Sequence, residues 1–225
     1  MQTWAVLFDW DGVVVDSSRQ HKAAWELFAA EHRLPLPPDH FERSFGMRNP
    51  PIIMELLQWT SDPVEAQRLA DLKEVLYRRI VDEHGLDMIA GSRRLLDELR
   101  AQGVPCAVAS SAPRENLDAA LASLDLRGHF AAIVSAEDVR RGKPDPEVFL
   151  KAAARLGVTP RQACVIEDAH VGIAAARAAD MLAVAVATTH SAASLGDADH
   201  VVASPEALDA AMLQRWLRAR NHGQV

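Results

Sequence analysis

Two aspartates, Asp9 and Asp11, follow a short apolar run that begins at Trp4 and ends at Phe8. An apolar run of this length is typical of a buried strand. Side chains alternate along an extended chain, so both carboxylates are expected on the same side, and Gly12 then lets the chain turn. Two neighbouring carboxylates repel each other unless a cation lies between them or one of them holds a proton. Either arrangement indicates chemistry, although an ordinary Asp-Gly turn after a strand is the simpler alternative.

Three later segments also carry polar residues where an apolar run or a stiff loop ends. Ser110 and Ser111 follow a second apolar run, where a hydroxyl and backbone N–H groups can bind a phosphate oxygen or cap a helix. Lys143 is followed at once by proline, which favours a fixed position over a solvated charge. Glu167 and Asp168 follow a third apolar run, where the dipole of a helix would by itself favour acids.

Taken together, these residues predict a site of hard oxygen ligands with one balancing cation. Asp9, Asp168 and the backbone carbonyl of Asp11 are candidate ligands of Mg²⁺, which prefers oxygen. Lys143 and Ser110 are expected to hold the oxygens of a transferring phosphoryl group. Phosphoryl transfer needs mainly positioning and neutralisation of charge, and this set of residues supplies both.

Alternating strands and helices are expected to position these residues. From Gly91 onward, apolar runs and helical patterns alternate, which predicts a parallel sheet covered on both faces, with ligands beyond the carboxyl ends of the strands. The predicted fold class is α/β, a doubly wound parallel sheet of the Rossmann-like kind with an inserted helical domain. The expected strands are 4–8, 104–109, 132–135, 163–166, 182–186 and 201–202; the expected helices are 18–32, 51–59, 63–84, 92–102, 114–124, 146–156, 170–179 and 205–220. Residues 1–16 with 87–225 form the predicted core, and residues 17–86 the helical insertion.

Composition excludes several classes of protein. The chain has 225 residues, 49% of them hydrophobic, and a formal net charge of -7, which is not the profile of a nucleic-acid binder. No apolar run approaches the roughly 20 residues of a membrane span, and we expect no signal peptide. Cys106 and Cys164 lie in apolar runs and are expected to be buried, which predicts a reducing, cytoplasmic location. A small phosphorylated metabolite is the expected partner, and a monomer or weak homodimer the expected assembly.

The order of these motifs, Asp-x-Asp, then serine, lysine and an acidic pair, resembles that of the haloacid dehalogenase superfamily of phosphotransferases. Segments 142–149 and 167–179 resemble its branch of β-phosphoglucomutases and small phosphatases, whose members carry a helical cap after the first motif. The resemblance implies that Asp9 is a nucleophile forming an aspartyl phosphate and that Asp11 is the general acid and then the base. It also implies Mg²⁺ at the acidic residues, with Glu167 acting through water or orienting its neighbours.

The helical insertion carries a weaker resemblance. His21 and Trp25 match a β-phosphoglucomutase pattern in which the histidine couples cap closure to positioning of the general acid; alternatively, the two form a packed aromatic face. Gly46 and Arg48 resemble the substrate-binding Gly-x-Ser-Arg segment of the β-phosphoglucomutases, but the arginine is displaced by one position relative to that pattern. Lys73 resembles a lysine in the cap of the mutase, but on this helix it can equally be a solvated charge, which is the interpretation we favour.

The candidate site residues therefore fall into three groups. They are Asp9, Asp11 and Lys143 for catalysis; Ser110, Ser111, His21, Gly46 and Arg48 for binding phosphate and substrate; and Asp9, Asp11, Glu167 and Asp168 for Mg²⁺. The predicted function is a Mg²⁺-dependent phosphatase of a sugar or polyol phosphate. The alternatives are a mutase of the β-phosphoglucomutase type and a non-catalytic metabolite-binding protein.

Overall fold

The chain divides into two compact units. The computed structural model describes residues 3–44 and 46–223, and its units are Met1–Val15 with Met88–Val225, and Asp16–Asp87. The second unit is one residue wider at each end than the insertion expected from the sequence. In the described part of the chain, no helix combines the length and apolar character that crossing a bilayer requires.

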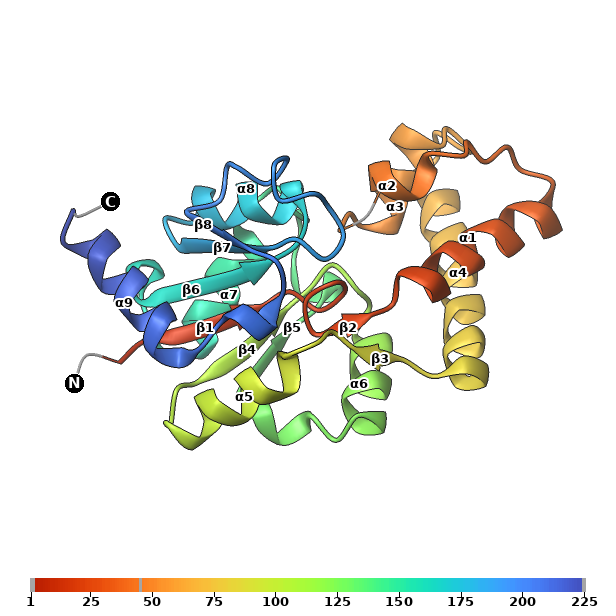
Figure 1. Ribbon diagram of the computed structural model, residues 1–225. Helices are drawn as coiled ribbons and strands as arrows, with labels where there is room; N and C mark the ends of the chain where they lie inside the picture. Colours follow the sequence, from red (N-terminus) through yellow and green to blue (C-terminus); the bar gives the residue numbers. More distant parts are fainter. Residues whose placement is uncertain (1–2, 45, 224–225) are drawn as a thin grey trace. The chain divides into compact units, whose positions relative to one another are not determined.

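The first unit is built on a six-stranded sheet in the order β5-β4-β1-β6-β7-β8, and its strand pairs are parallel (Figure 1). The strands are β1 (Ala5–Phe8), β4 (Cys106–Ala109), β5 (Ala132–Val134), β6 (Ala163–Glu167), β7 (Leu182–Val186) and β8 (His200–Val202). Every residue of β1, β4, β6 and β7 is buried, which explains why these strands read as continuous apolar runs. The predicted fold class is confirmed.

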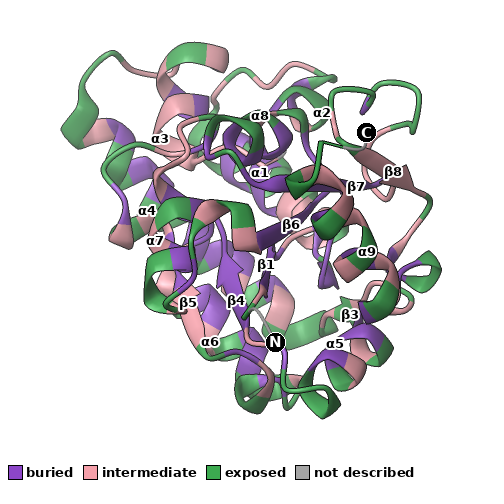
Figure 2. Ribbon diagram, turned by 90° about the vertical axis from the view of Figure 1, so that its left-hand side faces the viewer, coloured by how far each residue is buried: buried purple, intermediate pink, exposed green. Residues whose placement is uncertain are grey.

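Helices cover both faces of this sheet. Figure 2 shows α7 on one side of the sheet and α5 with α9 on the other. The helices are α5 (Ser92–Ala101), α6 (Arg114–Ser123), α7 (Glu147–Arg155), α8 (His170–Ala178) and α9 (Ala210–Asn221), with short 3₁₀ turns at Arg127–His129, Ala136–Asp138, Pro160–Gln162 and Pro205–Ala207. Alternate residues of the strands, such as Leu7 and Val165, pack against apolar residues of α7 and α8 in one core cluster.

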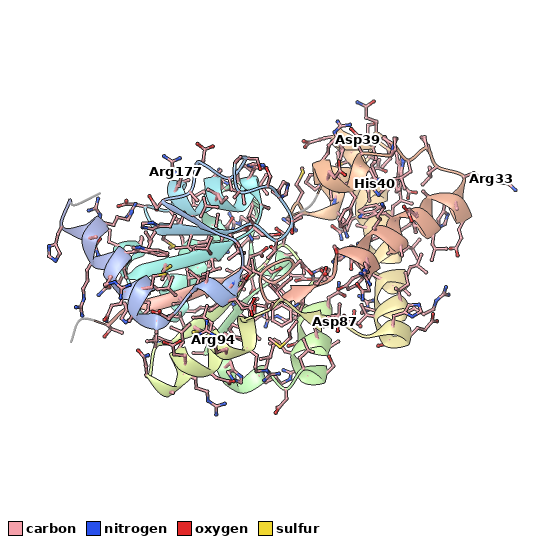
Figure 3. The ribbon with its side chains drawn as sticks, viewed as in Figure 1. Arg33, Asp39, His40, Asp87, Arg94 and Arg177 are labelled. Atoms are coloured by element: carbon pink, nitrogen blue, oxygen red, sulfur yellow. The ribbon has the colours of Figure 1, made fainter. Side chains whose placement is uncertain are left out.

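The last helix differs from its prediction. The expected helix 205–220 is interrupted, because Asp209 caps a new helix by accepting a hydrogen bond from the Met212 N–H at 2.6 Å. Arg94 of α5 donates to the carbonyl oxygens of Pro205 and Leu208, which ties the segment before α9 to its neighbouring helix (Figure 3).

The second unit is helical. Its elements are α1 (Ser18–His32), α2 (His40–Ser44), α3 (Asn49–Pro51), a π-helical turn (Ile52–Leu56) and α4 (Pro63–His84). The chain passes between the units at β2 (Val15–Asp16) and β3 (Asp87–Met88), which pair with each other. The helices pack around one apolar cluster that includes Trp25, Phe28 and Tyr77.

The expected helix 51–59 is wrong in both its start and its type. Helical structure begins at Asn49, because prolines are tolerated in a first turn, where the backbone N–H has no partner within the helix. It continues as a π turn, in which the Leu57 N–H donates to the Ile52 carbonyl at 2.8 Å. Ile52, Ile53 and Leu57 are all buried in the apolar cluster of this unit.

Candidate active site

Three neighbouring strands bring the predicted site residues together. β1 lies between β4 and β6, with Phe8 in register with Val108 on one side and Ile166 on the other. Because all three strands are parallel, their carboxyl ends meet at one edge of the sheet. The Asp9 N–H donates to the Ile166 carbonyl at 3.0 Å, so the residue after β1 is fixed beside β6.

Lys143 joins two of the buried acids. Its Nζ lies 2.7 Å from Asp9 Oδ1 and 2.6 Å from Glu167 Oε1, and all three side chains are buried. These are charge-assisted hydrogen bonds, the stronger kind. Lys143 therefore has the fixed position that the proline after it predicted, and the alternative of a solvated charge is wrong.

The loop that carries Lys143 is held by a further carboxylate. Glu147, at the start of α7, accepts hydrogen bonds from the N–H groups of Arg140 and Arg141, both at 3.0 Å. Its own N–H donates to Asp145 Oδ1 at 3.0 Å. The loop is therefore fixed by hydrogen bonds on both sides of the lysine, in addition to its prolines.

Glu167 and Asp168 have different surroundings. Glu167 uses both oxygens, since Oε2 accepts from the N–H groups of Asp168 and Ala169 at 2.8 and 2.7 Å, and Oε1 accepts from Lys143. Asp168 Oδ2 accepts from the Thr189 hydroxyl, whereas its Oδ1 is buried without a hydrogen-bond partner among the described residues. Of the two acids, Asp168 is the one with an oxygen left for a ligand.

The acidic residues resist ionisation together. Burial raises the pKa of Asp9 to about 7; Lys143 opposes this rise, whereas Glu167 and Asp11 add to it. Burial also raises the pKa of Asp168 well above its usual range, with Glu167 and Asp9 contributing. Burial alone would lower the pKa of Lys143, but Asp9 and Glu167 outweigh it and raise that pKa. One lysine does not compensate this many buried carboxylates.

The residues present fit a divalent cation. Ligand oxygens of Asp9, Glu167 and Asp168 all lie within 4.8 Å of one another, the one such group found in the described part of the chain. The donors are carboxylates, as Mg²⁺ prefers, and the orphaned Asp168 Oδ1 supplies an unused ligand atom. The two oxygens that Glu167 already uses favour an orienting role or a contact through water over direct ligation.

A tight turn follows β1. The N–H groups of Val14 and Val15 both donate to the Trp10 carbonyl, at 2.9 and 3.1 Å, and the Gly12 N–H donates to the Val15 carbonyl at 2.7 Å. Gly12 has φ +78°, a conformation that other residues rarely adopt. Asp11 is half-buried in this turn, and its carboxylate is outside the group of three described above. The role predicted for its backbone carbonyl in binding Mg²⁺ stays a prediction.

Ser110 is the buried residue that follows β4. Its hydroxyl oxygen accepts from the Ala112 N–H at 3.0 Å, which leaves the hydroxyl proton able to donate to a ligand. The alternative role as a helix cap is wrong, because Pro113 precedes α6 and no side chain caps that helix. Ser111 is half-buried in the same turn.

Sequence reasoning missed the loop after β7. Thr188, Thr189 and His190 each contact Gly12 or Asp168. The available signal was their place directly beyond an apolar run, the same rule that identified Asp9 and Ser110. Threonine carries no charge and recurs at no fixed spacing, so nothing else in the sequence pattern identifies these threonines as site residues.

The residues predicted in the helical unit form a network of their own. Lys73 is buried, against our interpretation as a solvated charge; its Nζ lies 2.8 Å from His21 Nδ1 and 2.8 Å from Glu74 Oε1. Asn49 donates to the same Glu74 oxygen at 2.6 Å. His21 stacks on Tyr77 with ring centroids 3.9 Å apart.

The other two predicted residues of this unit lie in the segment before α3. Gly46 has φ +81°, and Arg48 Nε is buried with no hydrogen-bond partner in the part of the chain that the structure describes. This N–H is therefore a hydrogen-bond donor that no described residue uses.

Known proteins share this arrangement. Residues 5–180 match the model of the haloacid dehalogenase-like hydrolases. The Arabidopsis thaliana protein 5-amino-6-(5-phospho-D-ribitylamino)uracil phosphatase, chloroplastic, is 36% identical over 200 residues, 87% of this chain and 53% of that protein, so the chain spans about half its length. Validoxylamine A 7'-phosphate phosphatase of Streptomyces hygroscopicus subsp. limoneus is 34% identical over 195 residues, 86% of this chain and 90% of that protein.

A solved structure shares the fold of this chain. The crystal structure of β-phosphoglucomutase from Clostridium difficile superposes with a TM-score of 0.86 at 27% identity, covering 98% of this chain and 100% of that one. The matched residues include all four motifs of the sequence, namely Asp-x-Asp, the serine, the lysine and the acidic pair. The chain belongs to the haloacid dehalogenase-like hydrolase family.

Proposed function

We propose that the protein is a Mg²⁺-dependent phosphatase that hydrolyses a small phosphorylated metabolite, a sugar or polyol phosphate, through an aspartyl phosphate. The observation that carries this proposal is the buried group around Asp9, in which Lys143 fixes one oxygen of the nucleophile and Asp168 keeps one oxygen unused. The names of the two curated relatives, both phosphatases, support it.

The chemistry divides into two steps. In the first, a carboxylate oxygen of Asp9 forms a bond to phosphorus while the bond from phosphorus to the substrate oxygen breaks, and Asp11 gives that oxygen a proton. In the second, Asp11 takes a proton from water, the water oxygen bonds to phosphorus, and the bond to Asp9 breaks. Lys143 and Ser110 hold the phosphoryl oxygens throughout. The chemistry that Mg²⁺ supplies when bound at Asp9 and Asp168 is neutralisation of the carboxylate and phosphate charges.

The helical unit is proposed to select the substrate. His21, Gly46 and Arg48 are the candidates to bind the part of the substrate beyond the phosphoryl group, and the unused Nε of Arg48 supports this for an oxygen-rich molecule. Arg48→Met should raise KM and leave kcat close to the parent value, because it removes binding rather than chemistry. Arg43→Met, at an exposed arginine of the same unit, is the control.

A mutase of the β-phosphoglucomutase type is the second candidate. It is favoured by the buried contact of Lys73 with His21, since Lys73 resembles a lysine of the mutase, and by the superposition with the Clostridium difficile enzyme. Sequence identity does not separate the two candidates, because validoxylamine A 7'-phosphate phosphatase and the β-phosphoglucomutase of Bacillus subtilis are each 34% identical to this chain. The displaced Arg48 weakens the case for a bisphosphate intermediate.

One experiment separates the two candidates. Purified protein with Mg²⁺ is incubated with a panel of sugar and polyol phosphates, and separately with β-glucose 1-phosphate and a trace of glucose 1,6-bisphosphate. Free phosphate and glucose 6-phosphate are followed in parallel, with Asp9→Asn as the blank. Phosphate release that Asp9→Asn abolishes supports the phosphatase. Glucose 6-phosphate without phosphate release establishes the mutase, and turnover by Asp9→Asn contradicts the nucleophile.

We also propose that the protein acts in the cytoplasm as a monomer or weak homodimer, without nucleic-acid or membrane partners. Support comes from two free, buried cysteines and the net charge of -7. Burial raises the pKa of the Cys106 thiol to about 12, so it is an inert packing group. Sedimentation velocity over a range of concentrations tests the assembly.

A further inference from the structure

Three consecutive residues of the loop after β7 attach to both acidic motifs. The Thr188 hydroxyl donates to the Gly12 carbonyl at 2.5 Å, and the Thr189 hydroxyl donates to Asp168 Oδ2. His190 Nδ1 lies 3.1 Å from the Asp168 carbonyl oxygen, and because a carbonyl only accepts, the imidazole proton of this contact is on Nδ1. The loop thus holds the turn after β1 and the end of β6 in one arrangement.

We propose that Thr189 is a positioning residue that aims the Asp168 carboxylate at the cation. This inference rests on the Mg²⁺ site of the proposed function. A carboxylate has two oxygens, and the hydroxyl of Thr189 takes Oδ2. The other, Oδ1, is fully buried and has no hydrogen-bond partner among the described residues. The hydrogen bond therefore fixes the rotation of the carboxylate and leaves a single oxygen directed to a ligand.

The packing around Gly12 supports a role more specific than filling space. A Cβ placed on Gly12 would collide with Asp168 Oδ2 and would lie 2.7 Å from Thr189 Oγ1. The glycine therefore makes room for the hydroxyl–carboxylate contact directly beside the turn that carries Asp11. A valine side chain has nearly the shape of threonine, so Thr189→Val keeps the packing while removing the donor.

The test measures magnesium itself. Binding of MgCl₂ to the whole purified protein is followed by isothermal titration calorimetry without substrate. For Thr189→Val we expect the dissociation constant for Mg²⁺ to rise about 10- to 100-fold, the usual cost of losing a group that orients a metal ligand. Thr189→Ser keeps the donor and should bind like the parent. Ser191→Ala, which removes an exposed hydroxyl from the same loop, is the matched control.

Each outcome decides the inference. Parent-like Mg²⁺ affinity in a folded Thr189→Val protein overturns it, as does equal weakening in the serine variant. If circular dichroism shows that Thr189→Val is unfolded, Thr189→Ala takes its place in the same comparison. A parent protein that binds no Mg²⁺ overturns both the inference and the metal dependence of the proposed function. A parent that binds Mg²⁺ but releases phosphate from no ester contradicts only the proposed function, because the affinities still test Thr189.

Discussion

Gly172, in the first turn of α8, lies directly beside the Glu167 carboxylate. A Cβ at this position would collide with both Glu167 oxygens, so glycine is the residue that fits at this position of the helix. At an open helical position, replacing glycine by alanine stabilises by about 1 kcal/mol. We expect the opposite sign for Gly172→Ala, because the displaced Glu167 loses its bonds to Lys143 and to two backbone N–H groups.

The measurement for Gly172→Ala combines phosphate release with thermal unfolding. Activity should fall about 10- to 100-fold, the cost expected for disturbing an orienting group, and the melting temperature should also fall. Gly196→Ala is the control, since a Cβ there would meet only the Ala193 carbonyl at 3.9 Å. A Gly172→Ala protein that is more stable than the parent and fully active would show that Glu167 tolerates displacement.

Lys143 compensates the charge of two buried acids, in addition to the phosphate binding proposed for it. Lys143→Met would leave Asp9 and Glu167 buried without their shared cation, and breaking such a pair costs about 3–5 kcal/mol. We expect a loss of this size in the free energy of unfolding by urea without Mg²⁺, whereas exposed Lys22→Met should change little. Partial recovery in the double variant Lys143→Met with Glu167→Gln would attribute the loss to the uncompensated carboxylate. A Lys143→Met protein as stable as the parent would contradict this account.

At the residue scale, the sequence was informative where a charged group ends a strand. The arrangement of Asp9, Glu167 and Asp168 follows from that rule, because parallel strands place their carboxyl ends side by side. Lys143 lies in a loop, and the proline after it was the signal that identified it. Lys73 was misinterpreted because its burial depends on His21, 52 residues away in the sequence. Such a pairing leaves no mark on the local pattern of the helix that carries the lysine.

At the scale of elements, periodicity predicted most helices of nine or more residues well, and it predicted the short helical segments of the second unit poorly. The expected bounds of α1 and α4 agree with the structure, because apolar spacing that continues over four or more turns restricts where a helix can begin and end. Segment 49–57 was mispredicted because the five-residue spacing of a π turn, from Ile52 to Leu57, cannot be distinguished from α-helical spacing over so few residues.

The acid stability of the helical unit should depend on Glu74 of α4. Burial alone would raise the pKa of this carboxyl, but Lys73, His21 and Asn49 outweigh it and hold the pKa at about 2, against an ordinary value of 4.5. A carboxyl whose pKa is lower in the folded state stabilises above its unfolded pKa, and this contribution disappears as the pH falls toward 2. At about 1.4 kcal/mol per pKa unit, the contribution at pH 7 is on the order of 3 kcal/mol.

Urea unfolding of Glu74→Gln and the parent, followed by far-UV circular dichroism, tests this pH dependence. The variant should be less stable at pH 7, and the difference from the parent should shrink between about pH 5 and pH 3. Glu65→Gln, at an exposed acid of the same helix that pairs with Arg68, should show no comparable convergence. A difference that is constant with pH would mean that the glutamine disturbs packing rather than charge.

At the scale of the whole molecule, the strand order explains how distant segments share one site. β1, β4 and β6 are neighbours in the sheet, although more than 90 residues separate β1 from β4 in the sequence. The helices that connect the parallel strands permit this order. The alternation of strands and helices predicted a parallel sheet, but apolar runs carry no information on which strand pairs with which. For the same reason the loop after β7 could not be assigned to Asp168 before β7 was placed beside β6.

Without a cation, the stability of the molecule should be limited by its own active site. Asp168→Asn removes one of three clustered carboxylates that share a single lysine, so without Mg²⁺ its melting temperature should equal or exceed that of the parent. Mg²⁺ at 100 times its dissociation constant should stabilise the parent by about 2.7 kcal/mol, a rise of about 5–10 °C, because only the folded state presents the site. The variant should not respond to Mg²⁺, whereas exposed Asp197→Asn should respond like the parent. Differential scanning calorimetry with EDTA and with MgCl₂ measures both effects. A parent that is indifferent to Mg²⁺, or a variant that melts well below it in EDTA, would mean that the buried acids are structural rather than reserved for a cation.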